Sequence, residues 1–154
     1  MNISNFLKTK HVIVNLKPSS KEDALVQVSQ KLAALSPDLD PAIVHRKIIE
    51  REKQSSTAIG GGVAIPHSTM TGIQDPICIL AQIPEGLAFD SPDGEPVYLI
   101  FMVIFPEQST GIQLKLLARI ARLCSYQELV QELKEAQTPD QLFDLLRKED
   151  SRHV

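Results

Sequence analysis

The chain has 154 residues, of which 43% are hydrophobic, and this is the length of one ordinary globular domain with a substantial core. Its formal net charge is −3 and its charged residues are scattered, so no polybasic stretch is present that could displace counterions from DNA or RNA. The longest apolar run, residues 97–105, is about half of the ~20 residues that a membrane-spanning helix needs, so we expect no membrane insertion.

The N-terminal residues and the two cysteines predict where the protein resides. The sequence from Met1 to Val14 has neither a continuous apolar stretch nor a small-residue cleavage site, so nothing marks it for secretion. Cys78 and Cys124 lie far apart, each inside an apolar run, where cysteine behaves as a small hydrophobe. We therefore expect a cytoplasmic protein with two buried, reduced thiols.

The first third of the chain predicts one strand followed by two helices. Residues 11–16 (HVIVNL) are rich in β-branched side chains and precede a proline, as in a short strand. The motif SKED at 20–23 has the form of a capping box and opens a helix that continues to Pro37. Asp40 and Pro41 form a helix-start signature, and this second helix extends to about Glu52.

The remainder of the chain adds strands and then helices. Three apolar runs predict strands, at residues 63–65, 77–83 and 97–105. Three capping signals predict helices, which begin at Ser109 or Thr110, at Ser125 with Glu128 as a capping box, and at Thr138-Pro139. The run 97–105 is apolar on both sides, as in a central strand of a sheet covered on both faces. Strands interleaved with helices indicate an α/β architecture, which we expect to form a single domain over residues 1–154.

The segment from Glu50 to Ser68 (EREKQSSTAIGGGVAIPHS) concentrates residues that could carry chemistry where a predicted strand ends. Histidine is largely neutral near pH 7 and nucleophilic enough to take a phosphoryl group on nitrogen and release it again. Pro66 and the apolar strand before it would hold the ring of His67 in place, and positioning is most of what phosphoryl transfer requires. Spacing alone leaves two interpretations open, a phosphoryl carrier and an ordinary loop histidine.

Other features of the sequence also have both a functional and an ordinary interpretation. The glycines at 60–62 could bring backbone N–H groups to an anion, but no lysine follows in P-loop spacing, and most such triplets are turns. Arg51 could pair with a phosphate or simply suit the C-terminal end of its helix. Gln113, in the first turn of a helix, could bind an anion or face solvent. No histidine or cysteine cluster has the spacing of a metal site.

Three stretches of the sequence resemble a known family. Residues 59–68 (IGGGVAIPHS) are similar to a motif of glycines, an apolar-Ala-apolar triplet, Pro-His and a small residue. REKQSST at 51–57 and AFDSPDGEPVYLIFMVIFP at 88–106 are similar to two further regions of the same family. The family is the mannitol/fructose class of phosphotransferase-system IIA domains, within it the nitrogen-regulatory type. The resemblance spans roughly the whole chain and implies one domain, with a mixed β-sheet flanked by helices on both faces.

The resemblance also implies a role for each matched position. His67 would accept phosphate from the phosphohistidine of a small phosphocarrier protein, and Arg51 would balance the charge of the phosphate, with no metal or cofactor. Ser68 stands where glycine is usual, and Gln113 where a second histidine is common. We count both among the phosphate-binding residues. A glutamine amide donates a hydrogen bond but cannot become cationic, and charge-assisted bonds are roughly twice as strong, so we expect slower phosphorylation.

This resemblance implies a phosphoryl carrier rather than a free-standing enzyme, with two outputs. A nitrogen-type regulatory protein would gate targets such as a potassium transporter or a sensor kinase. A component of a fructose/mannitol-type sugar transporter would pass phosphate to a IIB subunit. We favour the regulatory output, because no transport or IIB domain is attached to this sequence. A phosphorylation-impaired binding module is an alternative that Gln113 raises, and a hydrolase with His67 as base lacks a nucleophile motif such as GxSxG.

Overall fold

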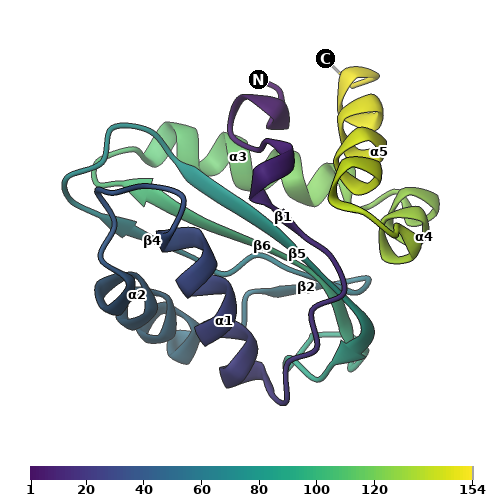
Figure 1. Cartoon of the computed structure of the whole chain (residues 1–154), viewed down its shortest axis with the longest axis horizontal. Helices are drawn as coiled ribbons and strands as arrows, with labels where there is room; N and C mark the ends of the chain where they lie inside the picture. Colours follow the sequence, from purple (N-terminus) through teal and green to yellow (C-terminus); the bar gives the residue numbers. More distant parts are fainter. Residues whose placement is uncertain (154) are drawn as a thin grey trace.

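The structure is a computed structural model, and it describes residues 1–153. One mixed sheet has the strand order β1-β5-β6-β3-β2, and β4 also pairs with β6. Its strands are β1 (Val12–Ile13), β2 (Ala58–Gly60), β3 (Val63–Ala64), β4 (His67–Met70), β5 (Ile77–Leu87) and β6 (Val97–Pro106). The α-helices among the described residues are α1 (Lys21–Ala33), α2 (Pro41–Gln54), α3 (Thr110–Leu123), α4 (Gln127–Glu135) and α5 (Pro139–Ser151). Helices α1 and α2 cover one face of the sheet and α3, α4 and α5 the other (Figure 1), which confirms the predicted α/β architecture.

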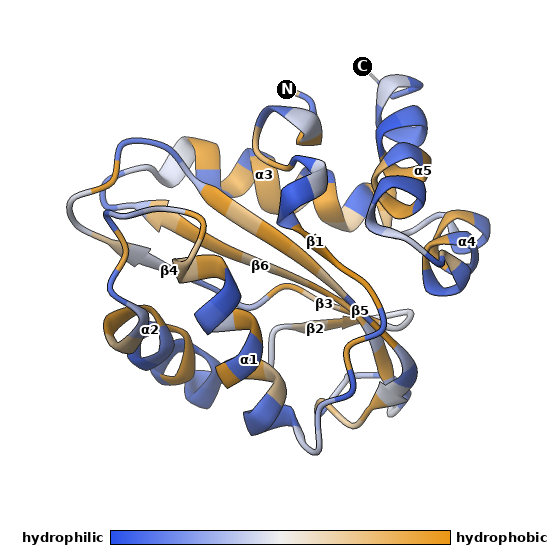
Figure 2. Cartoon of the chain, in the orientation of Figure 1, coloured by the Kyte–Doolittle hydropathy of each residue, from blue (hydrophilic) through white to orange (hydrophobic). Residues whose placement is uncertain are grey.

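Strand β6 separates two apolar cores, which explains why it is apolar on both sides. From Leu99 onward its side chains alternate between the core under α3 to α5 (Leu99, Phe101, Val103, Phe105) and the core under α1 and α2 (Ile100, Met102, Ile104). Successive side chains of a strand point to opposite faces, so a strand covered on both faces must be apolar at every position. Figure 2 shows this arrangement as hydrophobic strands between helices whose outer sides are hydrophilic.

Three of the predicted helix starts form as their sequences indicate. The side-chain oxygens of Ser20, Asp40 and Thr138 each accept a backbone N–H from the first turn of α1, α2 and α5, at 2.9–3.1 Å. Pro41 and Pro139 follow two of these residues at positions where a missing N–H costs nothing. These starts were predictable because a cap depends only on residues within one turn.

Two other helix starts differ from the prediction in detail. Ser109 precedes α3 as predicted, but its hydroxyl donates to the carbonyl of Pro106 (2.5 Å) and does not cap the helix. The prediction for α4 is wrong, because Tyr126 precedes that helix, and the hydroxyl of Ser125 donates to the carbonyl of Arg122 at 2.6 Å. A hydroxyl bound to the preceding helix is no longer free to form a capping box.

The strands required more correction than the helices. The first predicted strand is reduced to β1, because residues 9–11 form a 3₁₀ turn that includes His11. Strands β2 and β4 were not predicted, since both are short and contain glycine, serine or threonine. Their existence depends on pairing with β3 and with β6, partners that local composition does not reveal. His67 therefore follows the end of β3 after two residues, as predicted, and also opens a second strand, β4.

Helix α5 is tied to α3 and to the N-terminus by a buried ion pair. Arg119 of α3 donates from Nε to a carboxylate oxygen of Asp150 (2.6 Å) and from Nη2 to the Asp150 carbonyl (2.6 Å). Its Nη1 donates to the carbonyl of His153. The second carboxylate oxygen of Asp150, a residue only 1% exposed, accepts the N–H of Ile3 at 2.7 Å. Every nitrogen of this guanidinium is thus occupied within the fold.

Gln82 plays a comparable structural role in the middle of β5. Its buried amide donates to the carbonyls of Leu133 and Ala136, each at 2.8 Å, and its oxygen accepts the N–H of Asn15 at 3.0 Å. The last carbonyls of a helix have no partner within the helix, so this side chain satisfies the C-terminal end of α4. A polar residue inside an apolar strand is explained by these three bonds.

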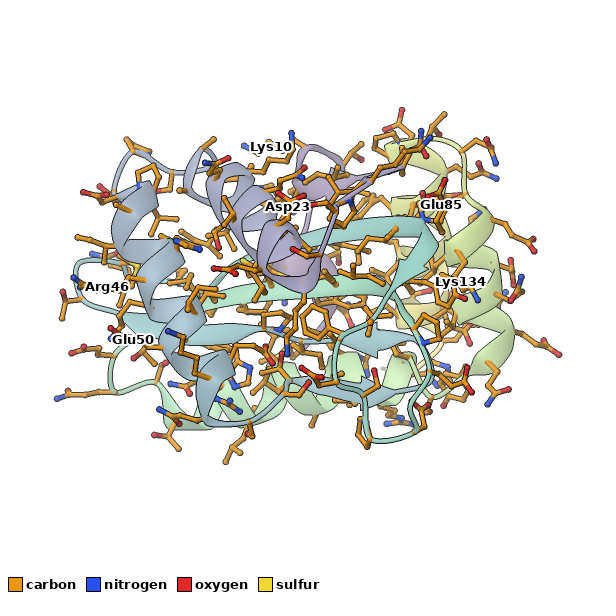
Figure 3. All side chains as sticks on the ribbon, turned by 90° about the horizontal axis from the view of Figure 1, so that it is seen from below. Lys10, Asp23, Arg46, Glu50, Glu85 and Lys134 are labelled. Atoms are coloured by element: carbon orange, nitrogen blue, oxygen red, sulfur yellow. The ribbon has the colours of Figure 1, made fainter. Side chains whose placement is uncertain are left out.

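Charged residues of both signs cover the outside of the molecule. Figure 3 shows Arg46 and Glu50 on the outer side of α2, where their nearest charged atoms lie 3.8 Å apart. Such exposed pairs contribute little to stability. No helix within residues 1–153 is both long and apolar enough to cross a membrane.

The two cysteines have no disulfide partner, as the sequence predicts. Cys78 and Cys124 are both buried and both free. Burial raises the pKa of each thiol to about 12, because a thiolate is poorly solvated in an apolar core. Neither sulfur is therefore a nucleophile near neutral pH.

Candidate functional site

His67 is the first residue of β4 and is held at the edge of the sheet by a continuous strand ladder. It lies opposite Val103 of β6, and the N–H of Val103 donates to the carbonyl of Pro66 at 3.0 Å. Strand β3 pairs with an earlier part of β6, so Pro66 falls between two short strands that share one neighbour. The backbone on both sides of His67 is fixed by a central strand, which gives the ring a rigid base.

The imidazole ring of His67 has one nitrogen bound and one free. Nδ1 lies 2.7 Å from the carbonyl oxygen of Ile65. A carbonyl can only accept a hydrogen bond, so we assign the proton of the neutral ring to Nδ1 and the lone pair to Nε2. Nε2 has no hydrogen-bond partner in the described part of the chain. The edge of the ring packs against Phe105, with 6.4 Å between ring centroids and an interplanar angle of 81°.

The surroundings of His67 lower the pKa of its imidazole below 6.5. Partial burial is the largest cause, because a charged ring loses solvation there. The bond to the Ile65 carbonyl acts in the opposite direction, the positive charge of Arg51 lowers the pKa further, and Glu52 raises it. The net result is a ring that is neutral at physiological pH, the state in which Nε2 is a nucleophile.

His67 lines an open groove of about 420 Å³ between α2 and α3. The groove is formed by Arg51 of α2, residues 56–59, Ile65, His67, and Leu114, Leu117, Ala118 and Ala121 of α3. Its surface is mostly apolar, and Arg51 is the only cationic side chain among the residues that line it. Two large apolar side chains are exposed at this groove, Ile59 at 45% and Leu114 at 67%.

Arg51 reaches the groove from the last turn of α2 with most of its donors unused. Nη1 donates to the carbonyl of Ser55 at 3.0 Å, which fixes the direction of the side chain. A guanidinium has five N–H groups in a planar fork. The remaining donors have no partner within residues 1–153, and Arg51 lines the same groove as His67. The structure therefore brings together Arg51 and His67, two of the residues that the sequence singles out.

The other two predicted phosphate-binding residues do not line this groove. Ser68 follows His67 in β4, and successive residues of a strand face opposite sides, so Ser68 shares a face with Met70 in the core under α2. Gln113 is half-buried in the first turn of α3, and its amide donates to the hydroxyl of Ser109 at 3.1 Å. Its neighbour Leu114 is the residue of that turn that lines the groove. A phosphate contact from Gln113 stays a prediction.

The glycine triplet is a turn whose backbone is bound within the protein. Gly60, Gly61 and Gly62 have φ angles of 88°, 64° and 85°, which side chains larger than glycine rarely adopt. The N–H of Gly61 donates to the carboxylate of Asp93 at 3.0 Å. A Cβ atom on Gly60 would lie 3.3 Å from the same carboxylate. The triplet thus lets the β2–β3 turn approach Asp93, which supports the interpretation as a turn.

Sequence reasoning missed the buried residue beside Arg51. Glu52 is 7% exposed, and its carboxylate accepts the N–H of Thr57 at 2.7 Å and the hydroxyl of Thr57 at 2.5 Å. Within REKQSST this glutamate looks like one charge among several on a solvated helix end. The only available signal was its spacing of five residues from a threonine beyond the helix end. Among residues 1–153, no cluster of histidine, cysteine and acidic side chains could hold a metal ion.

Comparisons with known proteins identify relatives of the chain and support the fold. Residues 5–149 match the family model described as phosphoenolpyruvate-dependent sugar phosphotransferase system, EIIA 2. A nitrogen regulatory protein of Pseudomonas aeruginosa is 31% identical over 146 residues, which cover 95% of each chain. The fructose-specific EIIABC component of the phosphotransferase system of Bacillus subtilis is 33% identical over 154 residues, or 97% of this chain and 24% of that protein. The crystal structure of the nitrogen regulatory protein IIA-Ntr from Neisseria meningitidis has a TM-score of 0.87 at 30% identity, covering 94% of this chain and 98% of the other. The predicted mixed-sheet fold is confirmed.

Proposed function

The chain belongs to the EIIA 2 family of the phosphoenolpyruvate-dependent sugar phosphotransferase system, and on that premise we propose that His67 carries a phosphoryl group between two partner proteins. The observation that carries the proposal is the hydrogen bonding of the His67 ring. Nδ1 is held by the Ile65 carbonyl at 2.7 Å, and Nε2 is left without a partner beside an open groove. A neutral nitrogen with a fixed direction is what in-line attack on phosphorus requires.

In the proposed reaction Nε2 of His67 attacks the phosphorus of the phosphohistidine on a small phosphocarrier protein. The bond from Nε2 to phosphorus forms as the donor's nitrogen–phosphorus bond breaks, and the electron pair of that bond returns to the donor ring. The proton on Nδ1 stays in place, so the acceptor ring takes up positive charge. The Ile65 carbonyl, 2.7 Å from Nδ1, stabilises that charge through their hydrogen bond.

Arg51 is proposed to bind the oxygens of the phosphoryl group in transit. Its guanidinium is permanently charged and has donors to spare in the groove. Because negative charge is spread over three equatorial oxygens in the transition state, fixed donors there stabilise the transfer without a metal ion. Ser68 and Gln113 are secondary candidates, and the amide of Gln113, which donates one N–H to Ser109, has a second N–H to offer.

The exposed surface around the groove supports a protein as the donor and the acceptor. Ile59 and Leu114 expose large apolar side chains next to the groove that contains His67. Apolar side chains at a site with a single cation suit the surface of a visiting protein better than a small anionic substrate. We therefore propose that the phosphocarrier protein contacts these two residues while its phosphohistidine enters the groove.

The test is transfer of labelled phosphate. The chain is incubated with the general enzymes of the relay, magnesium and labelled phosphoenolpyruvate, and an acid-labile label on the chain is expected. His67→Ala is expected to abolish the label, whereas His45→Ala, a change to a histidine of α2 outside the groove, is expected to retain it. A labelled His67→Ala protein would refute the assignment.

The output of the phosphorylated protein is proposed to be regulatory, as in the nitrogen regulatory protein that matches almost the whole chain. The match to a fructose-specific EIIABC component favours a second candidate, transfer to a IIB domain of a sugar transporter. Rapid loss of label to a purified IIB domain would support transport. Binding to a potassium transporter or a sensor kinase that changes with phosphorylation would support regulation. Retained binding without any labelling would instead support a phosphorylation-impaired module.

A further inference from the structure

Glu52 is a buried carboxylate at the end of α2, between two cationic neighbours that are not buried. Arg51 is half-buried in the groove and Lys53 is exposed, whereas Glu52 is only 7% exposed. Moving a carboxylate out of water is unfavourable unless it is both paired and hydrogen-bonded. The contacts that offset this burial therefore indicate what the residue does.

Both oxygens of Glu52 are used, and two of their three contacts are to Thr57. One oxygen accepts the N–H of Thr57 at 2.7 Å, and the other accepts its hydroxyl at 2.5 Å. The ammonium group of Lys21, the first residue of α1, lies 3.3 Å from the first oxygen. The segment that follows α2 is thus held to the helix at two points, by its backbone and by its side chain.

Thr57 in turn holds the residue that orients His67. The carbonyl of Thr57 accepts the N–H of Ile65 at 3.0 Å, and the carbonyl of Ile65 lies 2.7 Å from Nδ1 of His67. Ala58 and Ala64 continue this pairing as part of β2 and β3. Only two residues, Thr57 and Ile65, stand between the carboxylate and the ring. Glu52 itself does not line the groove, so it acts on His67 through them.

We propose that Glu52 is a positioning residue for phosphoryl transfer: by clamping Thr57 it fixes the Ile65 carbonyl, and so holds the proton of His67 on Nδ1 and its lone pair on Nε2. This inference rests on the proposed carrier function. The contrasting explanation is that Glu52 merely joins α1 to α2 through Lys21 and stabilises the fold. The two explanations differ in what the Thr57 bonds are for.

The charge of Glu52 acts in the same direction as its hydrogen bonds. Glu52 raises the pKa of His67, whereas Arg51 lowers it. Since the ring gains positive charge when Nε2 is phosphorylated, a nearby carboxylate stabilises the phosphorylated form as well as the geometry that leads to it. Geometry and charge can be separated, because an amide of the same shape retains the first and loses the second.

The experiment compares four chains. Glu52→Ala removes both bonds to Thr57, whereas Glu52→Gln can accept the Thr57 N–H with its oxygen and donate to the Thr57 hydroxyl with its nitrogen. Lys21→Met removes the ion pair and leaves the Thr57 bonds intact. Asp150→Ala is the matched control, since Asp150 is also a buried, paired carboxylate that accepts a backbone N–H, and it lies outside the groove.

Two quantities are measured at a temperature where every variant is folded by circular dichroism. The first is the fraction of His67 with the proton on Nδ1, from ¹⁵N NMR of the imidazole, and the second is the initial rate of phosphorylation. Glu52→Ala is expected to mix the two tautomers and to lower the rate on the order of tenfold, the scale seen when a partner that orients a histidine is removed. Glu52→Gln is expected to restore most of both, and Lys21→Met and Asp150→Ala are expected to change neither.

The inference is overturned if Glu52→Ala retains the Nδ1 tautomer and the unaltered rate, or if Lys21→Met reproduces its defects. If Glu52→Ala does not fold, Thr57→Val replaces it in the experiment, because that change removes only the hydroxyl bond to Glu52. The same shift of the His67 proton away from Nδ1 is expected. An unshifted tautomer in Thr57→Val overturns the inference. The NMR measurement needs no phosphate. A chain that is never labelled would therefore refute the carrier function while leaving the positioning of His67 separately testable.

Discussion

Two arginines of this protein, Arg119 and Arg51, differ in how many of their N–H groups are hydrogen-bonded. In the C-terminal region, Nε, Nη1 and Nη2 of Arg119 are all bound, to Asp150 and His153, and the side chain is largely buried. At the groove, Arg51 makes one bond, to the carbonyl of Ser55. Every guanidinium nitrogen is thus hydrogen-bonded in Arg119, whereas most N–H groups of Arg51 have no partner among the described residues.

This difference distinguishes a residue that stabilises the fold from one that is able to bind a ligand. A buried guanidinium whose donors are all satisfied stabilises a single arrangement of helices. A guanidinium with unused donors, on a groove that also contains a neutral imidazole, has capacity for an anion that is not part of the chain. The comparison predicts opposite consequences for stability and for phosphorylation when each arginine is replaced.

The largest effect on stability is expected from Arg119→Met. Removing the guanidinium leaves the carboxylate of Asp150 buried without its partner, and breaking such a pair costs about 3–5 kcal/mol. Urea denaturation measures the loss of the free energy of unfolding. Phosphorylation of the folded fraction is expected to be unchanged, and a variant that loses labelling while still folded would contradict the separation of the two regions.

Arg51→Met is expected to show the reverse pattern. Loss of the donors for the phosphoryl oxygens should lower the rate of phosphorylation roughly 10²-fold, the scale of removing one fixed transition-state donor. Its effect on the free energy of unfolding should be about 1 kcal/mol, because a single bond to the Ser55 carbonyl is lost. Arg51→Lys should lie between, since it keeps the charge and loses the planar fork. Equal rates for all three chains would remove Arg51 from the site.

The protonation of His67 is expected to respond to one arginine and not to the other. Burial lowers the pKa of His67 below 6.5, and Arg51 lowers it further. Between the lowered pKa of the folded protein and pH 6.5, the folded protein therefore binds fewer protons than the unfolded chain. Stability therefore falls as the pH drops through 6.5 toward the lowered pKa, and the nucleophilic ring persists at pH 6.5. NMR titration should give a midpoint below 6.5 that rises in Arg51→Met and is unchanged in Arg119→Met. A midpoint above 6.5 in the unaltered chain would contradict this account.

The smallest effect is expected from Gln113→His. A cationic imidazolium would donate a stronger hydrogen bond to phosphate than the glutamine amide does, so the rate of phosphorylation should rise about threefold. The amide of Gln113 is bound to Ser109 in this structure, and Ser109→Ala, which frees it, should produce a smaller rise. If neither variant differs from the unaltered chain, residue 113 makes no contact with the phosphoryl group.

The elements that could be predicted from the sequence are those specified by nearby residues. Helices α1, α2 and α5 begin at side chains that accept a backbone N–H within one turn. An unbroken apolar run predicts β6. Strand β4 could not be predicted, because HSTM has little strand character and is a strand only through its pairing with β6. The capping box expected at Ser125 failed because its hydroxyl bonds to the preceding helix.

The candidate site likewise contains residues that the sequence predicted and residues that only the fold reveals. Arg51 and His67 were singled out from the sequence, where a resemblance to a family supplied what spacing could not, and the fold places them in one groove. The role proposed for Glu52 depends on the bond between Thr57 and Ile65, which flank β2 and β3, and no local pattern encodes that contact. The exposed Ile59 and Leu114 were also missed, since exposure is a property of the folded surface and both residues are typical of a core.

The strand ladder beneath His67 has a consequence for how partners recognise the protein. Pro66, His67 and the three residues after it are joined by backbone pairing to β6, a strand whose side chains are almost all buried, so the backbone there is held on a rigid base. We therefore expect a phosphate on Nε2 to change the local charge and bulk at His67 with little movement of the surrounding backbone. If His67 is the carrier, a partner that discriminates between the two forms is therefore expected to contact His67 itself and not a distant part of the surface.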